Sequence, residues 1–367
     1  MNIKMRLLLL IISLIAFTAN AQENLNGKWL VENIAAASLK KNALGYVPDK
    51  QVGVYLPPSY FSSKKNYPVV YFLEGYGGRI DESAYVATLV DSLIKKNQIP
   101  EMIFIQISGD YSFRGSFYVN SPVTGNWEDF VVKDVTNFVD THYRTISDSE
   151  SRAIVGMSMG GFGVLNLAML HPDIYALAYA MSPGLFDEEG LANCQIFRDG
   201  GTIDPILSLI TKLDKLSTEE AHKEYLKYVG EIKDWNIEFT LAYGMAFAPN
   251  TKKAPYFDYP VSIVNGDTIV EKDKWEKWER GFGGLEEELT SYKNNLNKLK
   301  LLSIDCGYND VFKWIVDGSV FYANLLRDNK ISHSFELNQG DHGSMFVYQM
   351  YHKVLPTVAA GFKYENE

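Results

Sequence analysis

The sequence predicts an α/β fold, with a mostly parallel central sheet, helices on both faces and a helical cap insertion at residues 185–298. Two observations carry this prediction. Short continuous apolar runs, typical of strands buried on both faces, alternate along the chain with segments of helical periodicity. In addition, 46% of the 367 residues are hydrophobic and 22% are charged, which supplies a core and excludes a disordered or collagen-like chain.

Charge and cysteine content exclude several classes of protein. The chain holds 35 basic and 45 acidic residues, a formal charge of −10, with no basic block. This balance argues against binding to nucleic acid or to anionic membrane surfaces. The two cysteines, Cys194 and Cys306, exclude a disulfide scaffold and a cysteine-based zinc ribbon. Whether these two pair with each other stays open, because sequence spacing says nothing of their geometry.

The first 21 residues are typical of a signal peptide. Lys4 and Arg6 precede an apolar run at residues 7–17, and Ala19-Asn20-Ala21 forms a cleavage site before Gln22. The alternative, an N-terminal membrane anchor, is disfavoured because the run is short for a bilayer. We therefore expect a periplasmic or secreted protein, with no membrane insertion after cleavage, whose residues 22–367 form one catalytic domain.

The strands are expected in chain order from their apolar patterns. Residues 51–56 alternate and end at Pro57, whereas residues 68–73 are apolar throughout, as in a strand covered on both faces. The same reading gives the remaining strands, at 102–107, 153–156, 176–181, 299–304 and 334–337. Between them, apolar residues at helical spacing predict helices at 83–96, 127–142, 159–170 and 312–327.

The stretch 185–298 breaks this alternation. It carries helical patterns at 217–231 and 275–298, the second interrupted by glycines at 281, 283 and 284, and no evident buried strand. An independent second domain is the alternative to a cap, but no linker-like composition brackets the stretch. Its aromatic residues are expected to be mainly core, with sugar-stacking platforms as the alternative. They are Trp235, Tyr243, Phe247, Tyr256, Phe257, Tyr259, Trp275 and Trp278.

Residues 153–161, AIVGMSMGG, hold the strongest chemical signal. Gly156, Ser158 and Gly160 form a G-x-S-x-G motif between a predicted buried strand and a predicted helix. Such a strand-to-helix turn is sharp, so the neighbours of the serine must lack side chains, and it presents the serine hydroxyl above the sheet. The sequence therefore predicts Ser158 as a nucleophile, with the Met159 backbone N–H as one oxyanion donor.

A nucleophilic serine needs a base and an orienting acid. In folds with this strand-to-helix G-x-S-x-G turn, both follow the serine along the chain, the acid first and the histidine second. His342 lies in a loop directly after the last predicted strand, in QGDHGS, and is the expected base. Asp310, in the loop after the preceding strand, is the expected acid, with Asp305 inside that strand as the alternative. Asp341 adjoins the histidine and is expected to shape its loop.

The second oxyanion donor is expected after the strand at 68–73. There the sequence reads YFLEGYGG, in which Gly75 allows a close approach of the backbone and the Tyr76 N–H would donate. Glu74 precedes this turn. Its carboxylate either influences the base or pairs with a cation such as Arg79 or Arg114.

These motifs together resemble the α/β-hydrolase "putative esterase" family. The resemblance runs from about residue 32 to residue 342 and rests on VYLPPSY, YFLEGYGG, GSFYVNSPVTGNWEDF, GMSMGGFGVLNLAMLHPDIY and the CGYND…GDHGS tail. Relatives there include S-formylglutathione hydrolases, feruloyl and acetyl-xylan esterases, enterochelin esterases and mycolyltransferases. The resemblance implies the α/β-hydrolase fold, the triad Ser158, Asp310 and His342, and oxyanion donors at Tyr76 and Met159.

The resemblance further implies a serine carboxylic-ester hydrolase that works through an acyl-enzyme and needs neither a metal nor an organic cofactor. Export favours acyl or feruloyl esters of carbohydrate, or similar small esters, as substrates. An acyltransferase with the same triad and a non-catalytic binding protein are the alternatives. Glu74, Tyr118 and Trp127 are candidate substrate-binding residues. Glu74 is also a departure, since many relatives have histidine there.

Overall fold

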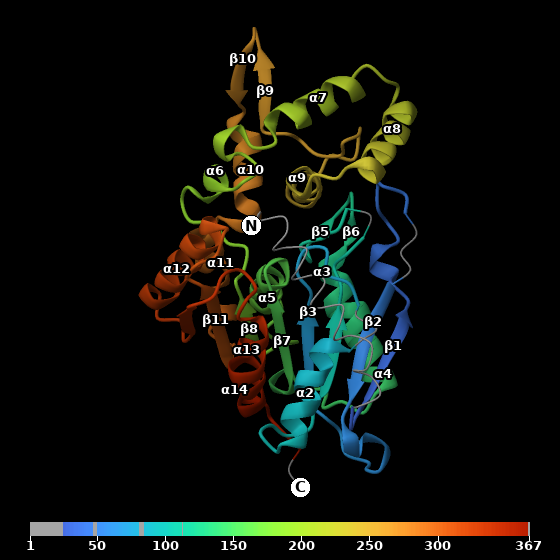
Figure 1. Ribbon diagram of the computed structural model, residues 1–367, viewed down its shortest axis with the longest axis vertical. Coiled ribbons are helices and arrows are strands. Elements are labelled where there is room, and N and C mark those ends of the chain that lie inside the picture. The colour runs from blue at the N-terminus through green and yellow to red at the C-terminus, as the bar shows by residue number, and fades with distance from the viewer. Residues whose placement is uncertain (1–24, 47–49, 81–83, 112, 366–367) are drawn as a thin grey trace, which may run out of the picture.

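The computed structural model describes residues 25–46, 50–80, 84–111 and 113–365. The signal peptide predicted at residues 1–21 lies outside these ranges, so it stays a prediction. The described residues form an eight-stranded sheet in the order β1-β2-β4-β3-β7-β8-β11-β12, seen at the centre of Figure 1. β1 and β2 run antiparallel, as do β2 and β4, and every later pair is parallel. The predicted mostly parallel sheet is confirmed.

The strands fall close to the predicted runs, with one addition. The sheet strands are β1 (Lys28–Ile34), β2 (Lys50–Leu56), β3 (Val69–Leu73), β4 (Ile103–Ile107), β7 (Arg152–Met157), β8 (Leu177–Met181), β11 (Leu301–Gly307) and β12 (Ser334–Asn338). β1 had not been predicted from the sequence. It is an edge strand that mixes buried and partly exposed residues, so it lacks the continuous apolar run of the central strands.

Burial on both faces explains the apolar run in β3. Val69, Tyr71 and Leu73 pack into one hydrophobic cluster, whereas Val70 and Phe72 pack into a second cluster on the opposite face. Successive side chains of a strand point to opposite faces, so a strand covered on both sides must be apolar at every position. All five residues of β3 are buried.

Helices cover both faces, as expected. One face is covered by α5 (Met159–Leu170), by α12 (Lys313–Asp328) and by a continuous helical segment made of α3 (Trp127–Asp129), η5 (Phe130–Val135) and α4 (Thr136–His142). The other is covered by α2 (Tyr85–Lys95) and by the C-terminal segment α13 (Phe346–Gln349), η8 (Met350–Val354) and α14 (Leu355–Gly361). No helix among the described residues has both the length and the apolar character needed to cross a bilayer.

Most of the stretch between β8 and β11 forms a helical layer at the top of Figure 1, whereas its last helix, α11, lies lower, beside α12. It contains α6 (Gly190–Asn193), α7 (Ile203–Leu213), α8 (Thr218–Glu231), α9 (Trp235–Phe247), α10 (Lys272–Phe282), α11 (Leu285–Leu296) and the hairpin of β9 (Val261–Val264) and β10 (Asp267–Val270). α8 starts in a capping box of Ser217 and Glu220. The helix predicted at 275–298 is two helices, because Gly283 ends α10 and Gly284, at φ 70°, precedes α11.

The topology places the candidate residues at one edge of the sheet. β3, β7, β8, β11 and β12 are parallel, so their carboxyl ends lie along the same edge. The loops that follow β3, β7, β11 and β12 carry Tyr76, Ser158, Asp310 and His342 respectively. In open α/β sheets this edge is where ligands bind.

Candidate active site

The nucleophile turn joins β7 to α5 at Ser158. Ser158 has φ 58° and ψ −118°, a backbone conformation that costs energy for a residue with a side chain. Its neighbours leave no room for side chains: a Cβ on Gly160 would lie 2.1 Å from the Leu73 carbonyl oxygen, and one on Gly156 would lie 2.7 Å from Gly160. The two glycines of the motif are therefore required by this packing, as the sequence predicts.

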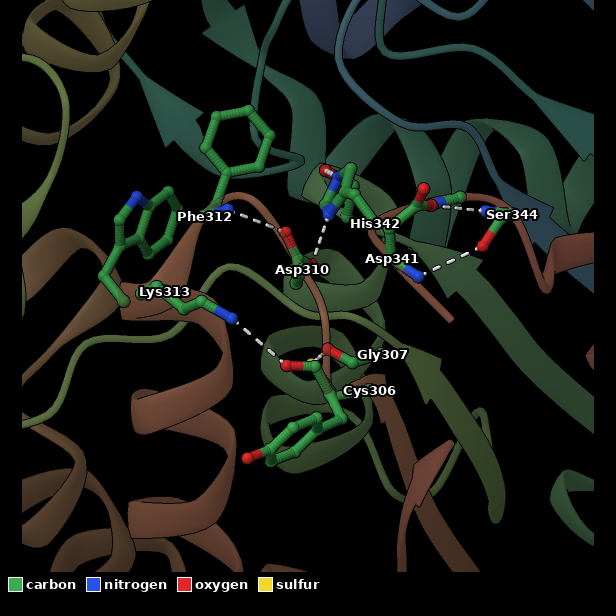
Figure 2. Close-up of polar contacts among 12 residues, drawn as sticks. Cys306, Gly307, Asp310, Phe312, Lys313, Asp341, His342 and Ser344 are labelled. Atoms are coloured by element: carbon green, nitrogen blue, oxygen red, sulfur yellow. Dashed lines mark hydrogen bonds and ion pairs between the residues drawn. The ribbon is translucent and has the colours of Figure 1, made fainter. Parts of the chain in front are cut away.

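The structure brings Ser158, His342 and Asp310 together. His342 Nε2 lies 3.0 Å from Ser158 Oγ, and His342 Nδ1 lies 2.7 Å from Asp310 Oδ2. Asp310 is fully buried, and its other oxygen accepts a hydrogen bond of 2.8 Å from the Phe312 backbone N–H. Figure 2 shows the Asp310 carboxylate between that N–H and the His342 ring. In this arrangement Nε2 can accept the serine proton, while the buried carboxylate holds the ring.

The loop of His342 is shaped by Asp341. Asp341 Oδ1 accepts hydrogen bonds from the backbone N–H groups of Gly343, at 3.1 Å, and Ser344, at 2.8 Å. The Ser344 hydroxyl in turn accepts from the Asp341 N–H at 3.1 Å, as Figure 2 shows. Asp341 thus shapes the loop of His342, as expected.

Asp305, the alternative acid, lies inside β11 and does not bond the His342 ring in the structure. Its side chain is 2% exposed and accepts a 3.4 Å hydrogen bond from the Asn338 side chain. Burial raises the pKa of Asp305 to about 7. A small cavity lined by Asp305, Gln349 and His342 lies on this side of the histidine.

We expect Asp305 to make stability fall as the pH rises. Its pKa is higher in the folded protein than in the unfolded chain, so the folded state binds this proton more tightly and loses stability between about pH 4 and about pH 7. Between pH 5 and pH 8 the loss amounts to about 3 kcal/mol, because the slope of 1.36 kcal/mol per pH unit acts only up to about pH 7. Urea unfolding of the wild type and of Asp305→Asn at both pH values measures it. The variant should lose less stability by about that amount, and an identical pH dependence would contradict the expectation.

The oxyanion loop follows β3 and lies against the nucleophile turn. A Cβ on Gly75 would lie 3.4 Å from the Met157 carbonyl oxygen and 3.7 Å from Ser158 Cβ, so the two loops are in close contact. Tyr76 and Met159 line the same cavity as Ser158 and His342. Their backbone N–H groups are the expected oxyanion donors, and this placement next to the serine is what such a role requires.

Tyr118, a candidate substrate-binding residue, does not line the cavity that contains Ser158. Its side chain is fully buried, and its hydroxyl donates to the Glu74 carbonyl oxygen at 2.8 Å. The same hydroxyl accepts a hydrogen bond of 3.1 Å from the Gly109 backbone N–H. Tyr118 therefore links the Gly109 backbone to the start of the oxyanion loop.

Trp127, another candidate for substrate binding, lies in the core. It is fully buried, its indole N–H donates to the Thr124 carbonyl oxygen at 2.9 Å, and it does not line the cavity at Ser158. The Lys50 ammonium lies 4.5 Å from the ring centroid. This contact is a cation–π interaction inside the fold.

Glu74, in contrast, does line the cavity with Ser158 and His342. One of its carboxylate oxygens accepts a hydrogen bond from the Gln106 side-chain amide. The two arginines considered as its partners form ion pairs with other carboxylates, Arg79 with Asp110 at 2.8 Å and Arg114 with Glu238 at 3.4 Å. Because Glu74 lines the cavity, it is in a position to contact a bound molecule.

A cavity of about 490 Å³ opens beside Ser158, within the usual size range of small-molecule sites. Its walls are mainly apolar and come from three parts of the chain. The sheet and the helices α2 and α13 contribute Phe72, Tyr85, Val86 and Phe346. The loop after β11 and the start of α12 contribute Phe312, Trp314 and Ile315. The cap contributes Trp235, Phe239 and Phe282. These walls suit the apolar part of a bound molecule, and Glu74 and Arg79 are charged side chains that also line the cavity.

Most aromatic residues of the cap are core. Tyr243 and Trp278 are fully buried, and Tyr256, Phe257 and Tyr259 are buried as well. Trp235 differs, because its side chain is 37% exposed and lines the cavity. Neither Trp235 nor Phe312 was assigned a site role from the sequence, since no local motif marks an aromatic residue that reaches a cavity from another segment.

Neither the two cysteines nor a metal site belongs to this arrangement in the part of the chain that the structure describes. Cys194 and Cys306 are buried free thiols. Within the described ranges, no group of three or more His, Cys, Asp or Glu side chains is arranged to hold a metal ion.

Comparison with known proteins finds similarity to esterases and an acyltransferase. The model of the "Putative esterase" family matches residues 48–227. Esterase Rv1288 of Mycobacterium tuberculosis is 31% identical over 142 residues, which are 38% of this chain and 30% of that protein. The diacylglycerol acyltransferase/mycolyltransferase Ag85A of Mycobacterium leprae is 28% identical over 149 residues, which are 38% of this chain and 43% of that protein. The matches thus span less than half of these curated relatives.

Among solved structures, a ferulic acid esterase superposes with a TM-score of 0.58 at 19% identity, covering 93% of this chain and all of that one. An S-formylglutathione hydrolase from Agrobacterium tumefaciens superposes with a TM-score of 0.54 at 13% identity, covering 92% of this chain and 97% of that one. At such identities the likeness concerns the fold. The α/β-hydrolase fold is confirmed, and so is the resemblance to the esterase family.

Proposed function

We propose, from its match to the "Putative esterase" family, that this protein is a serine carboxylic-ester hydrolase. The observation that carries the proposal is the hydrogen-bonded series Ser158–His342–Asp310 at the mouth of an apolar cavity. A nucleophile bonded to a base, which is in turn held by a buried acid, is what acyl transfer needs.

The reaction proceeds in two halves. Ser158 Oγ attacks the ester carbonyl carbon while His342 Nε2 takes the hydroxyl proton, and the Tyr76 and Met159 N–H groups stabilise the oxyanion. His342 then gives its proton to the leaving alcohol, which leaves an acyl group on Ser158. In the second half a water molecule, deprotonated by His342, attacks the acyl-enzyme and releases the acid. Asp310 stabilises the charged imidazole in both halves.

The cavity supports uncharged esters with apolar groups as substrates. Feruloyl and other acyl esters of carbohydrate fit this description, and one structural neighbour is a ferulic acid esterase. The predicted signal peptide supports export, where such esters would be met. Export predicts that the protein recovered outside the cytoplasm begins at Gln22, which N-terminal sequencing checks.

An acyltransferase is the second candidate, because one relative is a diacylglycerol acyltransferase/mycolyltransferase. The two functions share every catalytic residue and differ in whether water or an alcohol attacks the acyl-enzyme. The non-catalytic alternative is disfavoured by the intact hydrogen-bonded triad.

One experiment separates these functions. Purified protein is incubated with p-nitrophenyl acetate, p-nitrophenyl butyrate and methyl ferulate, with and without added glycerol, and the products are analysed by mass spectrometry. The hydrolase gives free acid in both cases, whereas a transferase gives mainly glycerol esters when glycerol is present. Lack of turnover of all three esters would contradict the proposal.

A further inference from the structure

Among the aromatic residues of the cap that line the cavity, Trp235 has the largest exposed fraction. It begins α9, and the Asp234 side chain caps this helix by accepting from the N–H groups of Asn236 and Ile237. The cap's other aromatic wall residues, Phe239 and Phe282, are only 5% and 2% exposed, against 37% for Trp235. Phe239 and Phe282 are therefore core residues, whereas Trp235 keeps an exposed part that a ligand can contact.

Trp235 also contacts both loops that act on the reacting atoms. Its ring centroid lies 5.6 Å from that of Tyr76 in the oxyanion loop, and 5.8 Å from that of Phe312 in a stacked arrangement. Phe312 packs edge-on against the His342 ring at 5.0 Å, and its N–H bonds Asp310. A group bound against Trp235 is therefore held beside the triad.

The position of α9 over these loops is fixed by a second contact. Glu238, one turn after Trp235, forms an ion pair of 3.4 Å with Arg114, which lies just before Gly115. A Cβ on Gly115 would lie 2.3 Å from the Tyr76 ring, so this loop packs directly on the oxyanion loop. The cap helix and the oxyanion loop are thus joined by both apolar and ionic contacts.

We propose, resting on the proposed ester hydrolysis, that Trp235 is the specificity-determining residue by which the cap selects esters carrying a large, flat, uncharged group. Phe239 and Phe312 already stack against the indole, and a bound aromatic ring would extend this group by packing on the part of Trp235 that stays exposed. An acetyl group fills only a small part of the cavity of about 490 Å³, so a short ester gains little from this wall. The two rings that stack on Trp235, those of Phe239 and Phe312, offer no partner for a charge, and the charged residues that line the cavity lie in the loop after β3.

The test uses three esters that differ in where a flat group lies: methyl acetate has none, methyl cinnamate has one on the acyl side and phenyl acetate has one on the alcohol side. Because their intrinsic reactivities also differ, each ester is compared between the wild type and the variant. Acid release is followed by titration, so no aromatic reporter is needed. Trp235→Ala should lower kcat/KM for at least one aryl ester by about 10- to 100-fold, mainly through KM, and leave methyl acetate within about threefold. Trp235→Phe should restore most of the loss, because it keeps a ring to stack on.

The control is Trp275→Ala. Trp275 is another cap tryptophan, packed against Phe197 at 5.0 Å, and it does not line this cavity. It should leave the ratio of aryl to methyl ester rates unchanged. An equal fall for all three esters in Trp235→Ala, or no fall at all, would overturn the specificity role while leaving ester hydrolysis intact. A wild type that hydrolyses none of the three would overturn both proposals.

Discussion

Replacing Ser158 with alanine is expected to abolish ester hydrolysis while leaving the fold intact. Ser158 supplies the oxygen that bonds to the acyl carbon, and the loss of such a residue typically costs about 10⁴- to 10⁶-fold in rate. The structure predicts little cost in folding, because alanine adds no atoms to the tight turn between Gly156 and Gly160. Initial rates on p-nitrophenyl butyrate, with a thermal unfolding curve for each protein, measure both effects.

Ser217→Ala is the matched control for this serine. Ser217 caps α8 in the cap and has no contact with the cavity. Its loss should cost about 1 kcal/mol of stability and leave the rate unchanged. A fluorophosphonate reagent, which phosphonylates activated serines with loss of fluoride, should label the wild type and Ser217→Ala but not Ser158→Ala. Activity of Ser158→Ala within tenfold of the wild type would show that another group is the nucleophile.

The parts of the site that local pattern encodes could be predicted from the sequence. Ser158 is marked by glycines that steric crowding requires, and the apolar run of β3 reports burial on both faces. His342 and Asp310 follow from the order of strands, since parallel strands bring the loops at their carboxyl ends to one edge. The predictions for Ser158 and β3 depend on local backbone geometry, which short segments of sequence record. The predictions for His342 and Asp310 depend on the alternation of strands and helices along the chain.

The roles of aromatic residues could not be predicted in the same way. Tyr118 and Trp127 lie in motifs shared with the esterases, yet both are buried and bond backbone carbonyl oxygens. Trp235 and Trp278 lie in the same insertion, yet one lines the cavity and the other is fully buried. What separates them is contact with segments distant in sequence, such as that of Trp235 with Tyr76, and no local periodicity records such contacts.

Asp310→Asn is expected to lower kcat by about 10⁴-fold, close to the effect of losing the serine. The Phe312 N–H donates to Asp310 Oδ1, so an asparagine there keeps its carbonyl oxygen toward Phe312 and turns its NH₂ group toward His342 Nδ1. Nδ1 must then accept a hydrogen bond, which leaves the proton on Nε2. In that tautomer Nε2 cannot take the proton of Ser158.

Asp305→Asn is the matched control for this argument, because it makes the same substitution in the strand that leads to Asp310. Asp305 bonds Asn338 and has no bond to the imidazole, so the variant should keep its activity within about tenfold. Rates of both variants on one ester, at a pH where the wild type is fully active, decide the matter. If Asp305→Asn were the more damaging change, the acid would be misassigned; if both lost little, the Asp310 contact with His342 would not control the tautomer.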